Sequence, residues 1–255
     1  MPHIAFVSPL GGTGQTTLIA NLATLLSGKG VPCLAVDLCT QNGLGIHLGL
    51  QQPSRIGWAS ACIQGQWWAD DATVNSNGVT YLPFGEVSGE ELVDLHHLLE
   101  QQPEWVPEQL QELEWDVGGV VLLDAPSWPS IQARQVLGYA DMIIICLDAS
   151  SRACHAQSLV KSMLAQTQSS STIGIVITDF DPRRQSQSNA LQTLHQQWAE
   201  MLIPYTLHKD EGVPAAFAQS SCVSVCNPNA QSAHDMQGIA NWIGQFCNVP
   251  LEVPL

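Results

Sequence analysis

The segment Val7–Leu18, with the sequence VSPLGGTGQTTL, has the clearest capacity for chemistry. Its glycines permit a turn in which successive backbone N–H groups face an anion, with the positive end of the following helix behind them. The residues expected in this turn are Gly11, Gly12, Thr13 and Gly14. A phosphate-binding loop normally continues with a lysine for the β- and γ-phosphates and a hydroxyl residue for Mg²⁺. Here Gln15 takes the lysine position and Thr16 and Thr17 follow, so the sequence predicts a phosphate site without its usual cation.

Two aspartates lie at the ends of apolar segments that are typical of buried strands. Asp37 lies near the end of the segment VPCLAVDL, and Asp124 ends the segment VVLLD. Open parallel sheets bind ligands in the crevice outside the carboxyl ends of the strands, so we expect both carboxylates to face that crevice. Thr16, Asp37 and Asp124 are therefore the predicted Mg²⁺ site, because this ion prefers oxygen ligands. If the protein is an active enzyme, Asp124 is its expected catalytic residue.

The order of the predicted elements places these residues on a doubly wound α/β fold. Near-continuous apolar segments predict strands covered on both faces, over His3–Ser8, Val31–Leu38, Val79–Phe84, Gly118–Ala125, Asp141–Ala149 and Thr172–Phe180. Helices are expected from Thr16 to Gly28, after a capping box at Ser88–Glu91, and over 153–166, 189–202 and 230–246. The polar segment 178–189 is expected to be a surface loop. We predict one domain, residues 1–255, with a mostly parallel sheet and helices on both faces.

The charge distribution argues against a nucleic-acid partner. The chain has a net charge of −15, and no Lys or Arg occurs between Arg55 and Arg134, where 13 of the 23 acidic residues lie. An acidic surface repels phosphate backbones. Two interpretations of the tryptophan-rich region 56–133 stay open: a solvated face, or a docking face for a basic partner. Trp67 and Trp68 cannot both point inward easily, so one of them is a candidate anchor for that partner.

The sequence predicts neither a membrane span nor a targeting segment. No apolar run reaches the roughly 18 residues of a membrane-spanning helix, and no basic region precedes the first apolar stretch. Several of the eight cysteines lie in apolar runs, where a reduced thiol packs as a small hydrophobic group. The C-terminal segment NWIGQFCNVPLEVPL lacks a basic amphipathic helix. We expect a cytoplasmic protein without direct membrane insertion.

Three of these segments together, GGTGQTT, VDLC and LLDAP, resemble the deviant-Walker-A family of P-loop ATPases that includes MinD and ParA. The similarity is closer to one branch, the bacterial cellulose biosynthesis proteins of the BcsQ type. The segments that carry it are Gly57–Trp68 (GWASACIQGQWW), Leu82–Glu91 (LPFGEVSGEE) and Leu207–Glu211 (LHKDE). The resemblance extends from the first strand to the final helix.

The resemblance implies a P-loop fold that binds ATP, with GTP as an alternative, together with Mg²⁺. It also implies a nucleotide-sandwich homodimer that acts with a small BcsR-like partner and other subunits of the cellulose synthase complex. Recruitment to the inner membrane or the cell pole would then be indirect. Thr178 and Asp179 correspond to the base-contacting position of the family, and Lys209 lies near the expected base pocket. Arg152 follows a strand close to the crevice and is a candidate substitute cation.

The sequence departs from the family pattern at three positions. Leu10 replaces the signature lysine, Gln15 replaces the P-loop lysine, and Cys39 replaces the second acid of the D-x-D motif that starts at Asp37. Each lost hydrogen bond to a charged group costs about 1.5–3 kcal/mol, so two losses reduce affinity about 10²- to 10⁴-fold. Phosphoryl transfer suffers more, because a single arginine finger contributes about 10³–10⁵ in rate. We therefore predict a degenerate ATPase that binds nucleotide and regulates or scaffolds a secretion system.

Two other functions stay open on the sequence. One is an active MinD/ParA-like ATPase that positions the secretion machinery with substitutes for the missing lysines. The other is a pure interaction module that no longer binds nucleotide. Co-purified nucleotide and phosphate release are the observations that separate the three.

Overall fold

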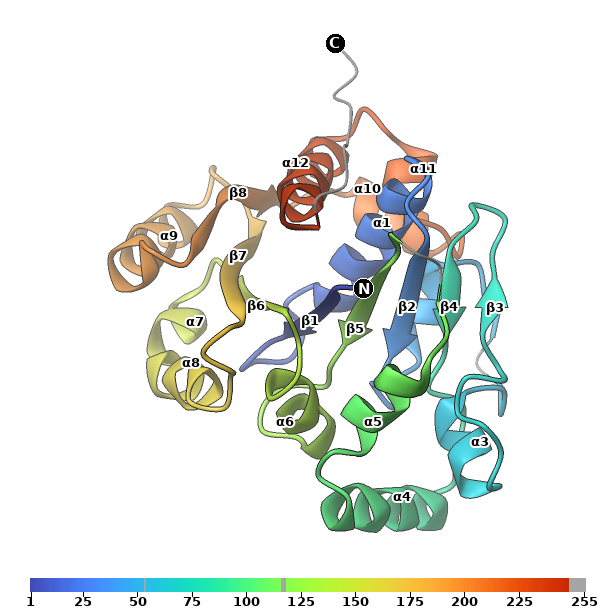
Figure 1. Cartoon of the computed structure of the whole chain (residues 1–255). Coiled ribbons are helices and arrows are strands. Elements are labelled where there is room, and N and C mark those ends of the chain that lie inside the picture. The colour runs from blue at the N-terminus through green and yellow to red at the C-terminus, as the bar shows by residue number, and fades with distance from the viewer. Residues whose placement is uncertain (53, 116–117, 248–255) are drawn as a thin grey trace.

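A single sheet of eight strands runs through the part of the chain that the computed structural model describes, residues 1–52, 54–115 and 118–247. Its strand order is β3-β4-β2-β5-β1-β6-β7-β8 (Figure 1). The strands are β1 His3–Val7, β2 Cys33–Asp37, β3 Thr73–Val74, β4 Thr80–Leu82, β5 Val120–Asp124, β6 Met142–Asp148, β7 Thr172–Phe180 and β8 Leu202–His208. Neighbouring strands pair in parallel except β3 and β4, which are antiparallel. The predicted mostly parallel sheet is confirmed.

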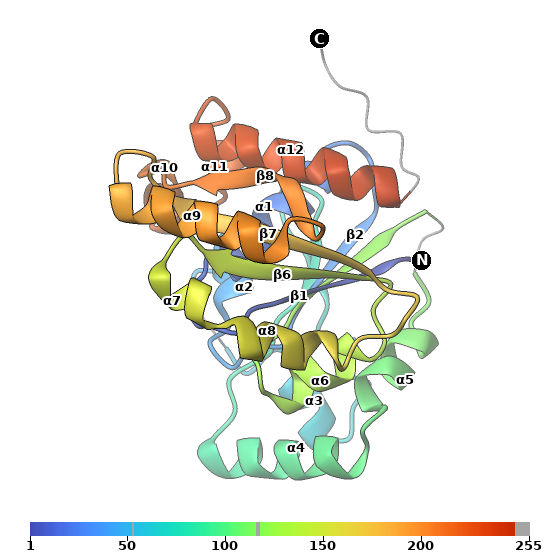
Figure 2. The same cartoon turned by 90° about the vertical axis from the view of Figure 1, so that its left-hand side faces the viewer.

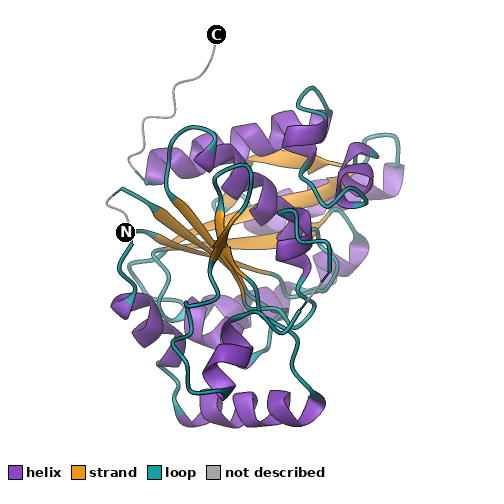
Figure 3. Cartoon of the chain, turned by 90° about the vertical axis from the view of Figure 1, so that its right-hand side faces the viewer, coloured by secondary structure: helices purple, strands orange, loops and turns teal. Residues whose placement is uncertain are grey.

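Helices cover both faces of this sheet (Figure 2). One face carries α1 Gln15–Ser27, α2 Gly43–His47, α10 Gly212–Phe217, α11 Val223–Cys226 and α12 Gln231–Phe246. The other carries α3 Trp58–Ile63, α4 Gly89–Gln101, α5 Trp105–Glu112, α6 Ile131–Leu137, α7 Ser151–His155, α8 Gln157–Leu164 and α9 Gln185–Trp198. Strand β1 shows why both faces need a cover, because its apolar side chains alternate between them. Ile4 and Phe6 pack into the core on the α1 and α12 side, while Ala5 and Val7 pack into the core on the opposite side. Figure 3 shows the twisted sheet between the two layers.

The capping box at the start of α4 is confirmed. Ser88 Oγ accepts from the backbone N–H of Glu91 at 3.2 Å, and Glu91 Oε2 accepts from the backbone N–H of Ser88 at 2.7 Å. Only Leu95 and Leu99 of this helix are buried, and its other face carries acids. This helix lies in the lower layer of Figure 1, and its exposed side chains include the acids Glu90, Asp94 and Glu100 beside the apolar Val93.

The surface loop expected over 178–189 is wrong in extent. Strand β7 continues to Phe180 and α9 begins at Gln185, because the Gln187 side chain accepts from the Asp181 backbone N–H and shortens the connection. The helix expected over 189–202 ends at Trp198, and Leu202 instead begins β8. The sequence LIPYTLH contains a proline and lacks a continuous apolar run, so the pattern did not predict a strand here. It forms β8 because this strand lies at the edge of the sheet, where the proline at position 204 is tolerated.

The helix expected over 153–166 is divided in two. Helix α7 ends at His155 and α8 begins at Gln157, with Ala156 between them. The helices within the described ranges include none with the length and apolar composition needed to span a bilayer. Residues 248–255, which form part of the C-terminal segment considered above, lie outside the described residues.

Candidate functional site

The glycine loop between β1 and α1 has the backbone geometry of an anion site. Gly12 and Gly14 have φ values of 74° and 73°, a left-handed conformation that glycine adopts without a steric penalty. Gly14 is also the N-cap residue of α1, and no side chain of the described chain caps this helix. The first-turn N–H groups of α1 are therefore left for a ligand, and they carry the positive end of the helix dipole.

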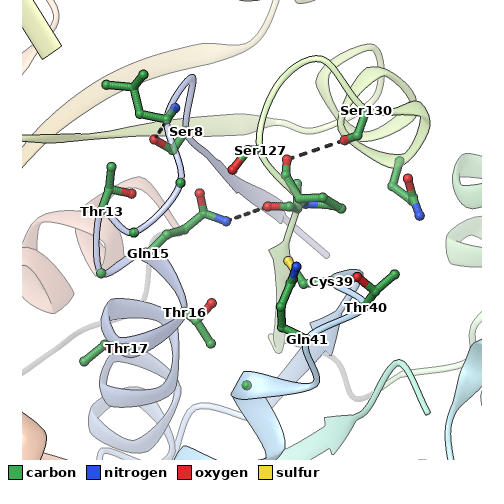
Figure 4. Close-up of a pocket in the computed structure, with 18 of the residues that line it drawn as sticks. Ser8, Thr13, Gln15, Thr16, Thr17, Cys39, Thr40, Gln41, Ser127 and Ser130 are labelled. Carbon is green, nitrogen blue, oxygen red and sulfur yellow. Dashed lines mark hydrogen bonds between the residues drawn. The ribbon is translucent and has the colours of Figure 1, made fainter. Parts of the chain in front are cut away.

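The Gln15 side chain links the start of α1 to the end of β5. Its Nε2 donates to Asp124 Oδ1 at 2.6 Å and to the backbone oxygen of Ala125 at 2.7 Å. Figure 4 shows the side chain extending from the start of α1 to the chain that follows β5. The amide holds the end of β5 against the loop but contributes no charge.

Asp37 and Asp124 are direct neighbours in the β2–β5 register, and both side chains are fully buried. They lie below the crevice rather than at its surface, which differs from the expectation that both face it. Asp37 uses both oxygens locally: Oδ1 accepts from the Cys39 N–H at 2.9 Å and Oδ2 from the Leu44 N–H at 3.1 Å. It therefore shapes the turn into α2. Asp124 Oδ2, by contrast, is buried without a hydrogen-bond partner in the described chain.

Burial dominates the electrostatics of this pair. Desolvation raises the pKa of Asp124 to about 6, although hydrogen bonding by Thr16 and Gln15 acts in the opposite direction. Thr16 thus lies close enough to act on the carboxylate, yet Oδ2 receives no hydrogen bond of normal geometry from the described residues. Desolvation and then the charge of Asp124 raise the pKa of Asp37 well above its usual range. Burial likewise raises the pKa of the Cys39 thiol far above neutrality, so this side chain cannot act as a base at pH 7.

A cavity of about 660 Å³ opens over the loop. This volume falls within the range of ordinary small-molecule sites. Its walls come from the glycine loop, from the chain after β2, from the chain after β5, and from Leu92 and His96 of α4. No Lys or Arg of the described residues lines it. The phosphate side of the site is therefore built from backbone dipoles and neutral side chains.

His47 and Phe217 belong to this cavity and were not predicted. The His47 Nε2 lies 3.1 Å from Thr17 Oγ1, and its ring centroid lies 4.5 Å from that of Phe217. Burial lowers the pKa of His47 to about 4, so the ring is neutral at pH 7 and adds no cation. No local sequence signal marks it, because α2 has only five residues.

A second cavity of about 300 Å³ shares Gly12, Gly14 and Thr17 with the first. The structure brings the predicted residues Thr178, Asp179 and Lys209 together in its wall. Thr178 Oγ1 donates to the Thr13 backbone oxygen at 2.7 Å, and Lys209 Nζ lies 3.3 Å from Asp179 Oδ1. The two cavities thus meet at the loop, as the phosphate and base ends of one ligand would require.

Arg152 contacts the loop from outside. Its guanidinium donates to the Gly11 backbone oxygen at 3.2 Å and pairs with Asp148 at 3.3 Å. The side chain is 53% exposed and lines neither cavity. In this conformation Arg152 supports the rim of the loop, and reaching a phosphate requires a different rotamer.

Comparison with known proteins decides the family. The family described as "Cellulose biosynthesis protein BcsQ" matches residues 1–243. The chain belongs to the BcsQ family. The cellulose biosynthesis protein BcsQ of Escherichia coli (strain K12) is 30% identical over 240 residues, which cover 91% of this chain and 90% of that protein. The BcsQ of Salmonella typhimurium is 26% identical over 249 residues, with 91% and 90% covered.

Solved structures share the fold at lower identity. The septum site-determining protein MinD of Pyrococcus horikoshii, complexed with Mg-ADP, superimposes with a TM-score of 0.80 at 18% identity over 99% of both chains. Cobyrinic acid a,c-diamide synthase of Mycobacterium smegmatis, with a bound ATP analog and magnesium, gives 0.78 at 18% identity, over 96% of this chain and 95% of that one. The predicted P-loop fold of the MinD type is confirmed.

The two BcsQ-type segments GWA and LPFG hold the loop that follows Asp37. Gly57 and Gly85 pack so closely that a Cβ atom on Gly57 would lie 2.3 Å from the Gly85 nitrogen. Trp58 Nε1 donates to the Asp37 backbone oxygen at 2.8 Å. Asn42 accepts from the Gly85 N–H at 2.8 Å and donates to its carbonyl oxygen at 3.2 Å. These segments therefore act as a scaffold for the β2 end of the site.

Proposed function

We propose that this BcsQ-family protein is a nucleotide-binding regulatory or scaffold subunit of bacterial cellulose biosynthesis and secretion. In this proposal it binds ATP with Mg²⁺ and hydrolyses it slowly or not at all. The observation that carries the proposal is the uncapped glycine loop, within the described chain, at the junction of two cavities without a lysine on the phosphate side. Backbone N–H groups at a helix N-terminus bind phosphate without a side-chain cation.

The residues present fit a magnesium ion. Asp124 Oδ2 is a buried carboxylate oxygen that has no partner among the described residues, and the Thr16 hydroxyl lies in the same site. Thr16 and Asp124 would hold the ion, which supplies charge neutralisation for the nucleotide phosphates when bound. Asp37 has both oxygens engaged by backbone N–H groups, so we assign it mainly to the shape of the loop.

Hydrolysis is disfavoured by the same residues. The Gln15 amide is neutral and directed at Asp124, His47 is neutral, and the Cys39 thiol cannot accept a proton at pH 7. Transition-state charge in phosphoryl transfer therefore finds no side-chain cation inside the cavity, judged on the described residues. Binding can persist under these conditions, but fast turnover cannot.

The partners are part of the proposal. The nucleotide would sit between two copies of the chain, and a small BcsR-like protein and other synthase subunits would bind elsewhere. Trp67 is 38% exposed while its neighbour Trp68 is buried, so Trp67 is the candidate anchor in the acidic region 56–133. A solved complex of MinC with MinD from Aquifex aeolicus, with a TM-score of 0.74, provides a precedent for partner binding on this fold. Membrane recruitment would then pass through these partners.

Mass spectrometry of gently purified protein tests the proposal directly. We expect ATP or ADP to co-purify, and we expect phosphate release with partners present to be slow and insensitive to Asp124→Ala. Turnover that Asp124→Ala abolishes would instead establish an active ATPase. If the protein binds no nucleotide at saturating ATP and Mg²⁺ with partner subunits present, a pure interaction module would be the remaining function. Analytical ultracentrifugation with and without ATP and Mg²⁺ tests the dimer, which should associate only with nucleotide.

A further inference from the structure

Three potential metal ligands meet under the glycine loop. Asp37, Cys39 and Asp124 each offer one ligand atom, and these atoms all lie within 4.8 Å of one another. All three side chains are buried, and the two aspartates are neighbours in the β2–β5 register. Zinc binds sulfur at about 2.3 Å and carboxylate oxygen at about 2.0–2.2 Å, so ligand atoms this close together can share one ion. Each Asp37 oxygen accepts one backbone N–H, and a carboxylate oxygen has a second lone pair for a metal.

The charge balance of this cluster is incomplete. Buried carboxylates in proteins are normally paired with a cation or bound to a metal. The ion pairs of the described residues leave Asp37 and Asp124 without any Lys or Arg partner. Gln15, which contacts Asp124, donates a hydrogen bond but carries no charge. A divalent cation would neutralise both carboxylates at once.

One oxygen of the cluster, the same one that would contact Mg²⁺ in the nucleotide-bound protein, has no partner in the described chain. Asp124 Oδ2 belongs to a fully buried side chain and makes no hydrogen bond within the described chain. Asp124 Oδ1 is occupied by the Gln15 amide. The free oxygen is an independent sign of a ligand, because buried polar atoms are almost always satisfied.

An ion also has a route into the cluster. Cys39 lines the 660 Å³ cavity, and its Sγ lies 3.4 Å from the Asp124 backbone oxygen. The thiol therefore stands between the open cavity and the buried carboxylates. Figure 4 shows Cys39 across the cavity from Gln15.

We propose that Asp37, Cys39 and Asp124 form a site for a thiophilic divalent cation of the Zn²⁺ class, which the apoprotein binds without nucleotide. The cysteine decides the class of ion, because thiolate ligands favour zinc over magnesium, whereas an all-oxygen set favours magnesium. Binding forms a metal–sulfur bond and releases the thiol proton to solvent. The site goes beyond the proposed function, since it requires neither ATP nor a partner.

Cobalt(II) is the probe for the test, because it replaces zinc and gives a sulfur-to-cobalt charge-transfer band. The full-length, reduced, metal-free protein is titrated with Co²⁺ in the absence of nucleotide. We expect one Co²⁺ per chain with a charge-transfer band, displacement by Zn²⁺, and a preference over Mg²⁺ on the order of 100-fold. Absence of stoichiometric Co²⁺ binding would overturn the proposal.

Cysteine variants assign the band. Cys39→Ser should abolish it and weaken Co²⁺ binding at least about tenfold, as expected for loss of one ligand-type contact. Cys146→Ser, a buried thiol in β6, and Cys226→Ser, an exposed thiol, are matched controls that should leave the band unchanged. A band that survives Cys39→Ser, or that disappears with Cys226→Ser, would show that the ion binds elsewhere.

A second variant keeps the test decisive if Cys39→Ser fails to fold, which circular dichroism reports. Cys39→Asp restores an oxygen ligand and should keep one Co²⁺ per chain without the charge-transfer band. Retention of the band in this variant would contradict the assignment. Calorimetry with ATP and Mg²⁺ is run separately, so a failure of nucleotide binding and a failure of this metal site are distinguished.

Discussion

The two cavities that meet at the glycine loop differ in charge. The larger, on the phosphate side, is lined within the described chain by backbone dipoles and neutral side chains, and its nearest carboxylates are buried beneath it. The smaller, on the base side, contains the charged residues Lys209, Asp179, Asp210 and Glu211. The side proposed to receive the phosphates is thus lined by no Lys or Arg of the described residues, while the side proposed to receive the base is lined by Lys209.

This difference is the one that the proposed function requires, nucleotide binding without fast hydrolysis. Backbone N–H groups and a helix dipole cannot be removed by changing side chains, so the anion site persists when lysine becomes glutamine. Catalysis depends on charge at the transition state, so under the proposed function it is reduced more than binding. The four predictions that follow test this contrast between the phosphate and base sides.

Gly14→Ala should have the largest effect on ATP affinity. Alanine disfavours the left-handed conformation of Gly14 by about 1–2 kcal/mol, and a shift of this residue redirects the N–H groups of the loop. Loss of two charge-assisted hydrogen bonds reduces affinity on the order of 100-fold, measured by calorimetry with ATP and Mg²⁺. Gly65→Ala is the matched control, with a φ of 69° and no neighbour at its Cβ position, as for Gly14. Equal affinity losses in both variants would mean that only stability changed.

Asp124→Asn should stabilise the protein at pH 7.5. The pKa of Asp124 is raised to about 6 in the folded state from an ordinary 3.8, so the folded state favours the protonated form. Its contribution to stability is complete below about pH 4 and is lost as pH rises through 6. Asparagine does not ionise, so the variant keeps its stability as pH rises. Its unfolding free energy at pH 7.5 should therefore exceed that of the wild type by about 3 kcal/mol at most.

Urea unfolding at pH 4 and pH 7.5 measures this difference, which should shrink at pH 4. Asp181→Asn is the control: the hydrogen bond from Arg183 lowers the pKa of Asp181 to about 2, so its stabilising contribution is lost only below about pH 4 and changes little between the two pH values. A stability difference for Asp124→Asn that is the same at both pH values would show that its buried charge is compensated.

Gln15→Lys should restore a cation to the phosphate side. A charge-assisted hydrogen bond contributes about 1.5–3 kcal/mol, so ATP affinity should increase roughly 10- to 100-fold. Gln41→Lys adds the same charge at an exposed position on the wall of the same cavity and should change affinity much less. Phosphate release should stay slow in Gln15→Lys, because Cys39 is unchanged. No gain in affinity would show that the lysine position no longer faces the phosphates.

The smallest effects are expected for the two exposed cations. Lys209→Ala removes an ion pair with Asp179 and a base-side contact, which together should reduce ATP affinity about 2- to 5-fold. Arg152→Ala should have an equal or smaller effect, because this side chain contacts only the rim of the loop. Fluorescence titration with a labelled ATP analogue compares the two. If Arg152→Ala lowers ATP affinity more than Lys209→Ala does, Arg152 contacts the phosphates and supplies a cation on that side.

The local pattern of apolar residues predicted the strands of the sheet better than the segments that connect them. The six apolar strands were correct because both faces of a parallel strand are covered, which requires continuous apolar sequence. Strand β8 was missed because it lies at the sheet edge, where its alternating and proline-containing sequence LIPYTLH is tolerated. The start of α9 was missed because a side-chain contact between Gln187 and Asp181 fixes it, and no hydrophobic period records that contact.

The sequence by itself determined the chemistry that is available: a glycine loop, two strand-end aspartates, and the replacement of two lysines and an acid by Leu10, Gln15 and Cys39. Only the tertiary structure decided that the Gln15 amide binds Asp124, that both aspartates are fully buried, that Thr178 contacts the loop, and that Lys209 lines the adjoining cavity. The reason is that parallel strands are joined by long crossovers. Residues more than 100 positions apart become neighbours through strand order and register, which no local segment encodes.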